Sequence, residues 1–191
     1  MKIGLFFGSF NPPHIGHLAI AEYFATQTDL EEVWLVVSPH NPLKEKSSLA
    51  HQRARLELCR LALGDNPKLR ISDIEFSLPL PSYTIDTLTH LGERYPKHNF
   101  SLLMGSDSLA SLPKWKNYEL LLERYKLHVY QRLGTPPTPL DAHNSVTLHA
   151  QMPQFNISAT YIRQQIQQKK SIRYLCPNNV IEEIERSGLY R

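Results

Sequence analysis

Long apolar runs are missing from this sequence. No stretch approaches the roughly 18 consecutive apolar residues that a membrane-spanning helix needs. The first apolar run, residues 3–7, is also too short for the apolar region of a signal peptide. We therefore expect a soluble, cytoplasmic protein that has no membrane partner.

Cysteine is equally scarce. Cys59 and Cys176 are the only two, and they stand far apart without the spacing typical of a metal site. Cys59 falls in a helical pattern, so we expect it to pack as a small apolar side chain. Reduced thiols are favoured over a disulfide in a cytosolic protein, although a pair of cysteines leaves that bond open.

A strong excess of charge of one sign is also absent. The 191-residue chain has a net charge of +3, with 20% charged and 41% hydrophobic residues. This balance lacks the basic surface of a nucleic-acid-binding protein, so we expect no nucleic-acid partner. A mild positive charge suits small polyanions, although so small a charge is equally compatible with no functional meaning. Length and composition fit a single domain over residues 1–191 with a substantial core.

Apolar runs of strand length alternate with helical periodicity along the chain. Residues 33–37, VWLVV, are apolar without interruption, which indicates a strand buried on both faces. The alternation predicts an α/β fold with a mostly parallel sheet and a small helical extension at the C-terminus. We expect strands at 3–7, 33–37, 69–76, 99–104, 126–130 and 146–148, and helices at 16–28, 50–63, 83–94, 118–124, 160–169 and 179–187.

Residues 8–17, GSFNPPHIGH, are the most informative segment. They join a strand to a helix, and the first N–H groups of a helix, with the positive end of its dipole, bind phosphate. His14 and His17 can each donate a hydrogen bond to a phosphoryl oxygen, and Gly16 permits close backbone approach. One capping and one exposed histidine would be the simpler interpretation, but the full GxFxPxHxGH pattern is specific. The segment predicts chemistry on a nucleotide phosphate.

A second polar cluster lies at residues 156–163, NISATYIR. Ser158 stands where a helix begins, and capping that helix is a sufficient reason for its presence. Two hydroxyls, from Ser158 and Thr160, and the guanidinium of Arg163 also match a polyphosphate site. Together with the first motif, this cluster predicts a triphosphate held between two distant segments.

Further candidates follow the other expected strands. Gly105 and Asp107, in GSD, are placed to approach a ribose, although a helix cap explains them equally well. Lys44, in NPLKEK, would close over phosphates if its loop moves, whereas a solvated loop is the commoner case. Arg132 follows the strand at 126–130 and is a weaker phosphate candidate. All of these lie at carboxyl ends of strands, where parallel sheets bind ligands.

Two segments with aromatic residues supply further candidates. Trp115, in LPKWKN, lies among charged residues that disfavour a core position, so its ring is available to stack on a flat ligand. Tyr83 and Thr84, in LPSYTIDT, begin a helix whose N–H groups would bind an anion. Capping by Ser82 or Thr84 is the competing explanation.

These blocks, in order, resemble the nicotinate-nucleotide adenylyltransferase family of the HxGH nucleotidyltransferase superfamily. The resemblance covers GSFNPPHIGH, PSYTIDTL, GSDSLASLPKW, FNISATYIR and the final SGLYR. It implies a Rossmann-like, doubly wound fold and a cytoplasmic enzyme of NAD biosynthesis, which joins nicotinate mononucleotide to the AMP part of ATP with Mg²⁺. A homo-oligomer is compatible with it, and no protein cage for a metal is implied.

The family pattern also implies residue roles. His14 and His17 would contact the phosphates of ATP, and Ser158, Thr160 and Arg163 would hold its triphosphate. Gly105 and Asp107 would bind the adenosine side. Gly8 and Ser9 would lie at the junction of the two nucleotides. Trp115 would stack on the pyridine ring, and Tyr83 with Thr84 would place its carboxylate. Lys44 and Arg132 carry over less securely, because the loop at Lys44 varies and an Arg-Leu-Gly run replaces Arg-Pro-Gly at Arg132.

Other acceptors remain open at this point. Nicotinamide mononucleotide and phosphopantetheine are alternative acceptors for the same chemistry, and the PSYT block with Trp115 argues against the second. A non-catalytic nucleotide-binding module is an alternative of another class, but it would not need both histidines together with ISATYIR.

Overall fold

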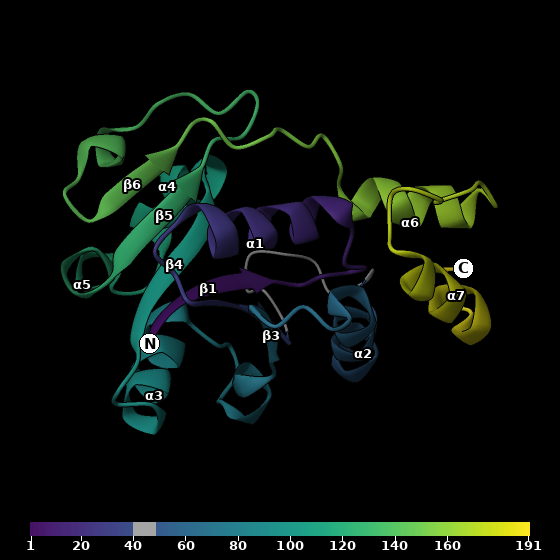
Figure 1. Cartoon of the computed structure of the whole chain (residues 1–191), viewed down its shortest axis with the longest axis horizontal. Helices are drawn as coiled ribbons and strands as arrows, with labels where there is room; N and C mark the ends of the chain where they lie inside the picture. The colour runs from purple at the N-terminus through teal and green to yellow at the C-terminus, as the bar shows by residue number, and fades with distance from the viewer. Residues whose placement is uncertain (40–48) are drawn as a thin grey trace.

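The computed structural model of the chain describes residues 1–39 and 49–191. In this part, six strands form one sheet with the order β3-β2-β1-β4-β5-β6, and every pairing is parallel. The strands are β1 Lys2–Gly8, β2 Glu32–Val37, β3 Leu69–Ser72, β4 Asn99–Gly105, β5 Lys126–Tyr130 and β6 Val146–His149. The order reverses between β1 and β4, which lie side by side (Figure 1). This arrangement confirms the doubly wound, Rossmann-like fold.

Helices cover both faces of the sheet (Figure 1). Their bounds are α1 Ile15–Gln27, α2 Gln52–Leu63, α3 Thr84–Arg94, α4 Ser106–Ser111, α5 Tyr118–Arg124, α6 Ala159–Gln167 and α7 Asn178–Ser187, with short 3₁₀ turns η2 Ile74–Ser77, η3 Leu112–Lys114 and η4 Pro139–Ala142. Of the helices described, none is both long and apolar enough to cross a membrane.

The central strands are buried on both sides, as the VWLVV segment predicts. Trp34 and Val36 pack into the core under α3 and α5, whereas Val33, Leu35 and Val37 pack into the core under α1 and α2. Alternate residues of one strand point to opposite faces, so an unbroken apolar run supplies both cores at once. The two cores hold β1 and β4 in place beneath the site.

The last two helices form the expected C-terminal extension. In Figure 1, α6 and α7 lie beyond the sheet on the side of α2. A third apolar cluster joins them to α2 through Leu58, Ile162, Cys176 and Val180. Cys59 and Cys176 are both free and buried, and burial raises the pKa of each thiol to about 12. Both cysteines therefore pack as apolar side chains.

The segment 69–76 differs from the predicted strand. β3 ends at Ser72, and η2 follows at Ile74–Ser77. The turn is closed by the N–H of Phe76, which donates to the carbonyl of Asp73 at 2.8 Å. Ile74 and Glu75 are both buried. In a strand, successive side chains point to opposite faces, so only one of the two would point inward, whereas the turn η2 lets both do so. The prediction was wrong for the second half of this segment.

Candidate active site

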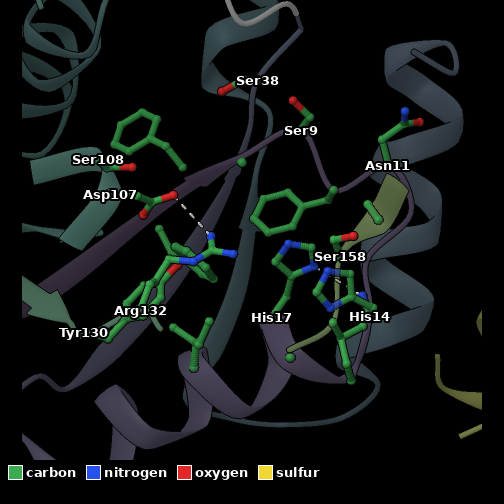
Figure 2. Close-up of a pocket in the computed structure, with 18 of the residues that line it drawn as sticks. Ser9, Asn11, His14, His17, Ser38, Asp107, Ser108, Tyr130, Arg132 and Ser158 are labelled. Carbon is green, nitrogen blue, oxygen red and sulfur yellow. Dashed lines mark hydrogen bonds and ion pairs between the residues drawn. The ribbon is translucent and has the colours of Figure 1, made fainter. Parts of the chain in front are cut away.

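The loop after β1 brings the two motif histidines together. His14 is the N-cap residue of α1, and its ring stacks on that of His17 with 3.6 Å between the ring centroids (Figure 2). The backbone N–H of His14 donates to Nδ1 of His17 at 3.2 Å. Because Nδ1 of His17 accepts this bond, the ring proton of neutral His17 resides on Nε2.

His14 is almost completely buried, with 5% of its surface exposed. Burial, and next the positive charge of Arg132, lower the pKa of His14 to about 4. Its ring is therefore neutral at pH 7. Its Nδ1 atom is buried and has no hydrogen-bond partner among the described residues. A Cβ at Gly16 would lie 3.1 Å from that atom, so the space that glycine leaves is taken by the His14 ring.

Phe10 supports the same pair from inside the loop. Its backbone has a φ of 44°, in the left-handed region that few non-glycine residues adopt. The side chain is buried, and its ring meets the ring of His17 edge-on with 5.0 Å between centroids. The strained backbone conformation thus places an aromatic wall behind His17.

A cavity of about 780 Å³ opens above the carboxyl ends of β1 and β4. It brings together residues that lie about 150 positions apart in the sequence, because His17 and Arg163 both line it. Of the residues predicted from the sequence, the cavity is lined by Gly8, Ser9, His14, His17, Tyr83, Thr84, Asp107, Trp115, Arg132, Ser158, Thr160 and Arg163. Lys44 lies in 40–48, outside the described residues.

Gly105 does not line the cavity but lies beneath a charged pair that does. Arg132 Nη1 is 3.4 Å from Asp107 Oδ2 (Figure 2), and the backbone N–H of Arg132 donates to Ser106 Oγ at 3.0 Å. A Cβ at Gly105 would collide with the Asp107 carboxylate and come within 2.8 Å of Arg132 Cδ. Glycine at this position therefore allows Asp107 and Arg132 to meet.

The α6 end of the cavity is tied directly to the histidine loop. Arg163 Nη1 donates to the carbonyl of Asn11 at 2.9 Å, and its Nη2 donates to Thr160 Oγ1 at 3.4 Å. Ser158 is the N-cap of α6, and its Oγ accepts from the N–H of Tyr161 at 3.2 Å. Ser158 therefore caps the helix, as the simpler interpretation required, and also faces the cavity.

Aromatic and cationic side chains at the start of α3 and in the segment before α5 also line the cavity. Tyr83 is the N-cap of α3, but no side chain caps that helix; Ser82 Oγ lies instead 3.3 Å from Glu75 Oε2. The ammonium of Lys116 is 4.8 Å from the centroid of the Tyr83 ring and 2.8 Å from Asp86 Oδ2. The competing explanation, capping by Ser82 or Thr84, is therefore wrong.

Trp115 is less exposed than its charged neighbours suggest. It is half-buried and packs against the core cluster under α3 and α5, while it still lines the cavity. Its Nε1 atom is buried and has no hydrogen-bond partner in the described residues. Trp115 is therefore neither a core residue nor fully exposed, and its availability for stacking stays a prediction.

Sequence reasoning missed Glu75 on the same wall. It is 3% exposed, and Thr87 Oγ1 donates to its Oε1 at 2.9 Å. Burial raises the pKa of this carboxyl above its usual range, while hydrogen bonds from Thr87, Ser38 and Ser82 partly oppose the shift. The available signal was an acidic residue between Ile74 and Phe76, a few positions before PSYT.

The donor set fits phosphate binding rather than a metal cage. Among the residues described, no group of three or more histidine, cysteine or acidic side chains is arranged to hold a metal ion. The cavity presents cationic Arg132, Arg163, Lys114 and Lys116, the neutral ring of His14, and the ring of His17. These groups complement several phosphoryl oxygens at once.

Comparisons with known proteins show which family the chain is similar to. The sequence model of the Cytidylyltransferase-like family matches residues 5–165. A protein of Cytophaga hutchinsonii named "Probable nicotinate-nucleotide adenylyltransferase" is 53% identical over 184 residues, which cover 96% of this chain and 95% of that protein. A protein of the same name from Flavobacterium psychrophilum is 50% identical over 192 aligned positions, covering 100% of both chains.

Solved structures share the fold at lower identity. The nicotinic acid mononucleotide adenylyltransferase of Plasmodium falciparum complexed with NaAD superposes with a TM-score of 0.82 at 19% identity, covering 99% of this chain and 97% of that one. The same enzyme complexed with APC has a TM-score of 0.80 at 18% identity, covering 99% of this chain and 96% of that one. Since the family match spans most of the chain and the curated relatives match it throughout, the chain belongs to the nicotinate-nucleotide adenylyltransferase family, a family of nucleotidyltransferases.

Proposed function

We propose that the protein transfers the adenylyl group of ATP to nicotinate mononucleotide, giving nicotinate adenine dinucleotide and pyrophosphate in NAD biosynthesis. The observation that carries the proposal is the shared cavity. Both histidines of the HxGH motif, Arg163 of α6, and the aromatic residues Tyr83 and Trp115 all line it. The curated relatives bear the name of this activity over the full chain length.

The acceptor phosphate is the nucleophile in this reaction. Its second pKa is about 6, so it is mostly a dianion at neutral pH and needs no general base. An oxygen of this phosphate bonds to the α-phosphorus of ATP while the bond from that phosphorus to the bridging oxygen of pyrophosphate breaks. The protein must position two polyanions and stabilise charge on the α-phosphoryl oxygens and the leaving pyrophosphate.

We assign the charge stabilisation to His14 and His17. His17 carries its proton on Nε2 because Nδ1 accepts from the backbone, so Nε2 is a fixed donor for an α-phosphoryl oxygen. His14 is neutral because burial lowers its pKa to about 4. A neutral imidazole carries one N–H group, which can donate a hydrogen bond to a phosphoryl oxygen without any transfer of the proton.

The remaining predicted residues divide between the two substrates. Gly8, Ser9, Ser158, Thr160 and Arg163 border the phosphates of ATP. Asp107 serves its ribose, and Gly105 acts indirectly because it leaves room for the Asp107 carboxylate. Arg132 pairs with Asp107 and adds a positive charge beside the phosphates, and Lys44 would add another. For the acceptor, Trp115 stacks on the pyridine ring, and Tyr83 and Thr84 present the uncapped N-terminus of α3 to its carboxylate.

A divalent cation accompanies nucleotide transfer of this kind, and we propose Mg²⁺. The cavity supplies cations and neutral donors rather than a cluster of carboxylates, so ATP phosphates, with Asp107 nearby, would hold the ion. When bound, it neutralises part of the triphosphate charge. The same residues of the protein would still bind and orient both nucleotides.

We further propose that residues 1–191 act as one nucleotidyltransferase domain, since the C-terminal extension supplies Ser158, Thr160 and Arg163 to a cavity built on the sheet. A cytoplasmic location suits an enzyme that consumes ATP. Self-association is compatible with exposed apolar side chains such as Leu133 and Tyr174.

The deciding experiment is an acceptor comparison. Purified protein is incubated with Mg-ATP and, in separate reactions, with nicotinate mononucleotide, nicotinamide mononucleotide or phosphopantetheine, and pyrophosphate and the dinucleotide product are measured. We expect the highest kcat/KM with nicotinate mononucleotide. Preference for another acceptor would reassign the substrate, and the absence of pyrophosphate with all three would leave a binding module.

A further inference from the structure

Arg55 of α2 is the largest fully buried side chain in the described part of the chain, with 0% of its surface exposed. It makes no ion pair with any described residue. Its guanidinium is bonded entirely to backbone carbonyls: Nε to Ala50 at 2.9 Å, Nη1 to Ser38 at 2.9 Å and to Ser9, and Nη2 to Pro39 at 3.0 Å. One side chain thus holds four carbonyl groups.

These carbonyls belong to the segments that border the phosphate end of the cavity. Ser9 lies in the histidine loop, Ser38 and Pro39 follow β2, and Ala50 precedes α2. Ser9 and Ser38 line the cavity, whereas Arg55 does not. The same segments are joined again by the N–H of Ser38, which donates to Gly8 O at 2.9 Å. Arg55 therefore acts from behind the cavity wall.

Arg55 and the four carbonyl groups that it holds are called the hub below. A second link connects this hub to α6. The N–H of Ala50 donates to Asn11 Oδ1 at 3.1 Å, and Asn11 O accepts from Arg163 at 2.9 Å. A continuous set of hydrogen bonds therefore runs from Arg55 through the histidine loop to the residue that faces the triphosphate. Displacing the Arg55 guanidinium would loosen each of these segments together.

Burying a guanidinium is costly, and the hub has no described acid to offset its charge. Removing a charged group from water costs several kcal/mol even after relaxation, and hydrogen bonds to carbonyls return only part of it. A side chain whose only task was to fill the core would be apolar. The arrangement is instead suited to a site that receives negative charge, because bound phosphates on the other side of the loop would favour the buried cation.

Tyr190, in the C-terminal SGLYR block, lies near Arg55. The hydroxyl of Tyr190 is buried and has no hydrogen-bond partner among the described residues, and it lies close enough to Arg55 and Arg163 to interact with both charges. The Tyr190 phenol is therefore a buried neighbour of both guanidinium groups. This gives the last block of the sequence a structural link to the site.

We propose that Arg55 is a positioning residue for ATP, which fixes the histidine loop and the segment after β2 around the triphosphate through its four carbonyl contacts. The inference rests on the proposed function insofar as ATP is the ligand. It assigns no contact between Arg55 and the substrate.

The test compares two substitutions at Arg55 with a matched control on the same helix. Arg55→Met removes both charge and donors, and Arg55→Lys keeps the charge but cannot span four carbonyls. Arg60→Met is the control, because Arg60 is exposed and pairs only with Glu57 on the surface. Mg-ATP binding is measured by calorimetry without an acceptor, and KM and kcat for both substrates are measured at a temperature where circular dichroism shows all variants folded.

We expect both Arg55 variants to weaken ATP binding by about tenfold or more, equivalent to about 1.4 kcal/mol. KM for the mononucleotide should change much less, and Arg60→Met should match the wild type. A purely structural role would lower the melting temperature equally with and without ATP and leave the Kd of ATP unchanged, which overturns the proposal. Full rescue by Arg55→Lys overturns it too, since charge alone would then suffice.

If Arg55→Met does not fold, the ATP-induced rise in melting temperature of Arg55→Lys decides: a reduced rise supports the proposal and a full rise contradicts it. If neither substitution folds, Arg55 is essential to the fold and the specific role for ATP is rejected. Failure of the proposed function is distinguishable, because it would appear in the wild-type protein as absent product or absent ATP binding.

Discussion

The ring of His17 is constrained on three sides. His14 stacks on it, Phe10 meets it edge-on, and the backbone N–H of His14 occupies its Nδ1. The ring proton therefore lies on Nε2, the atom from which His17 would donate to a ligand. A catalytic donor that is fixed before the substrate binds needs no reorganisation when charge develops on the phosphoryl oxygens.

Removing that donor should slow the chemical step. We predict that His17→Ala lowers kcat by about 100-fold or more, as expected for the loss of one transition-state donor. His17→Gln places an amide N–H near the position of Nε2 and should retain more activity than alanine. Steady-state kinetics with saturating ATP measures both, and His90→Ala on α3 is a control outside the cavity. A near-normal kcat for His17→Ala would remove His17 from the chemistry.

We propose that Trp115 contributes to binding rather than to the chemical step. Its indole is half-buried between the core and the cavity, so it offers one face to a ligand. We predict that Trp115→Ala mainly raises KM for the mononucleotide, because stacking stabilises the ground state and the transition state alike. Trp115→Phe should show a smaller rise. If only KM for ATP increased in these assays, the stacking assignment would be wrong.

At the scale of elements, the N-terminus of α6 combines a cap with a binding site. Ser158 satisfies the N–H of Tyr161, and the helix begins at the cavity wall, with Arg163 one turn further on. We therefore propose that stability and phosphate binding depend on the same hydroxyl-bearing residue, and substitutions can separate the two roles.

Three substitutions at Ser158 make that separation. Ser158→Ala should lower the free energy of unfolding by about 1 kcal/mol, because the cap is lost. Ser158→Asn and Ser158→Asp keep an oxygen acceptor, so both should unfold near the wild-type urea midpoint. Only Ser158→Asp adds a negative charge beside the triphosphate, and we predict that it raises KM for ATP several-fold while Ser158→Asn does not. Equal KM values for the two variants would place the triphosphate elsewhere.

The elements were predictable where one local signal dominates. VWLVV is apolar at every position, and a strand between two layers is the arrangement that buries such a run. The 69–76 segment carries a weaker alternation, and the turn at Asp73 redirects the chain into η2. Alternating polarity cannot encode a turn whose stability comes from the burial of Ile74 and Glu75 together.

Within the site, the motif residues were predictable from the sequence, whereas the buried residues that hold the surrounding segments in place were not. His14 and Arg163 belong to segments whose residue types suit phosphates. Arg55 and Glu75 are buried charges, and their burial depends on carbonyls and hydroxyls brought from other segments. Sequence periodicity assigns such residues to the surface, because it holds no information on those distant partners.

At the scale of the whole molecule, buried histidines link stability to pH. His128 of β5 and His149 of β6 lie with 3.1 Å between Nδ1 and Nε2, a contact that accommodates neutral rings. Burial, and next the proximity of His149, lower the pKa of His128 to about 4, and burial lowers that of His149 as well. With His14, whose pKa is also about 4, the fold holds several imidazoles that must take up protons when it unfolds in acid.

The sign of the effect follows from the unfolded chain, in which these rings regain the usual pKa of 6.5. Their contribution is complete above pH 6.5 and is lost as the pH falls from 6.5 towards 4. For each of His14 and His128, the loss at pH 5 is about 2 kcal/mol. The raised pKa of Glu75 acts in the opposite direction and offsets part of this loss.

We predict that the urea midpoint falls clearly between pH 7.5 and pH 5, and that His128→Gln reduces this fall because it removes one titrating ring. His128→Gln should also lower stability at pH 7.5, since it disturbs the contact with His149, so the difference between the two pH values is the quantity to compare. His143→Gln, at an exposed position in the loop before β6, is the matched control and should keep the wild-type difference. An unchanged pH difference in His128→Gln would show that His128 has the same pKa in the folded and the unfolded chain, and would contradict the lowered pKa of this ring in the folded protein.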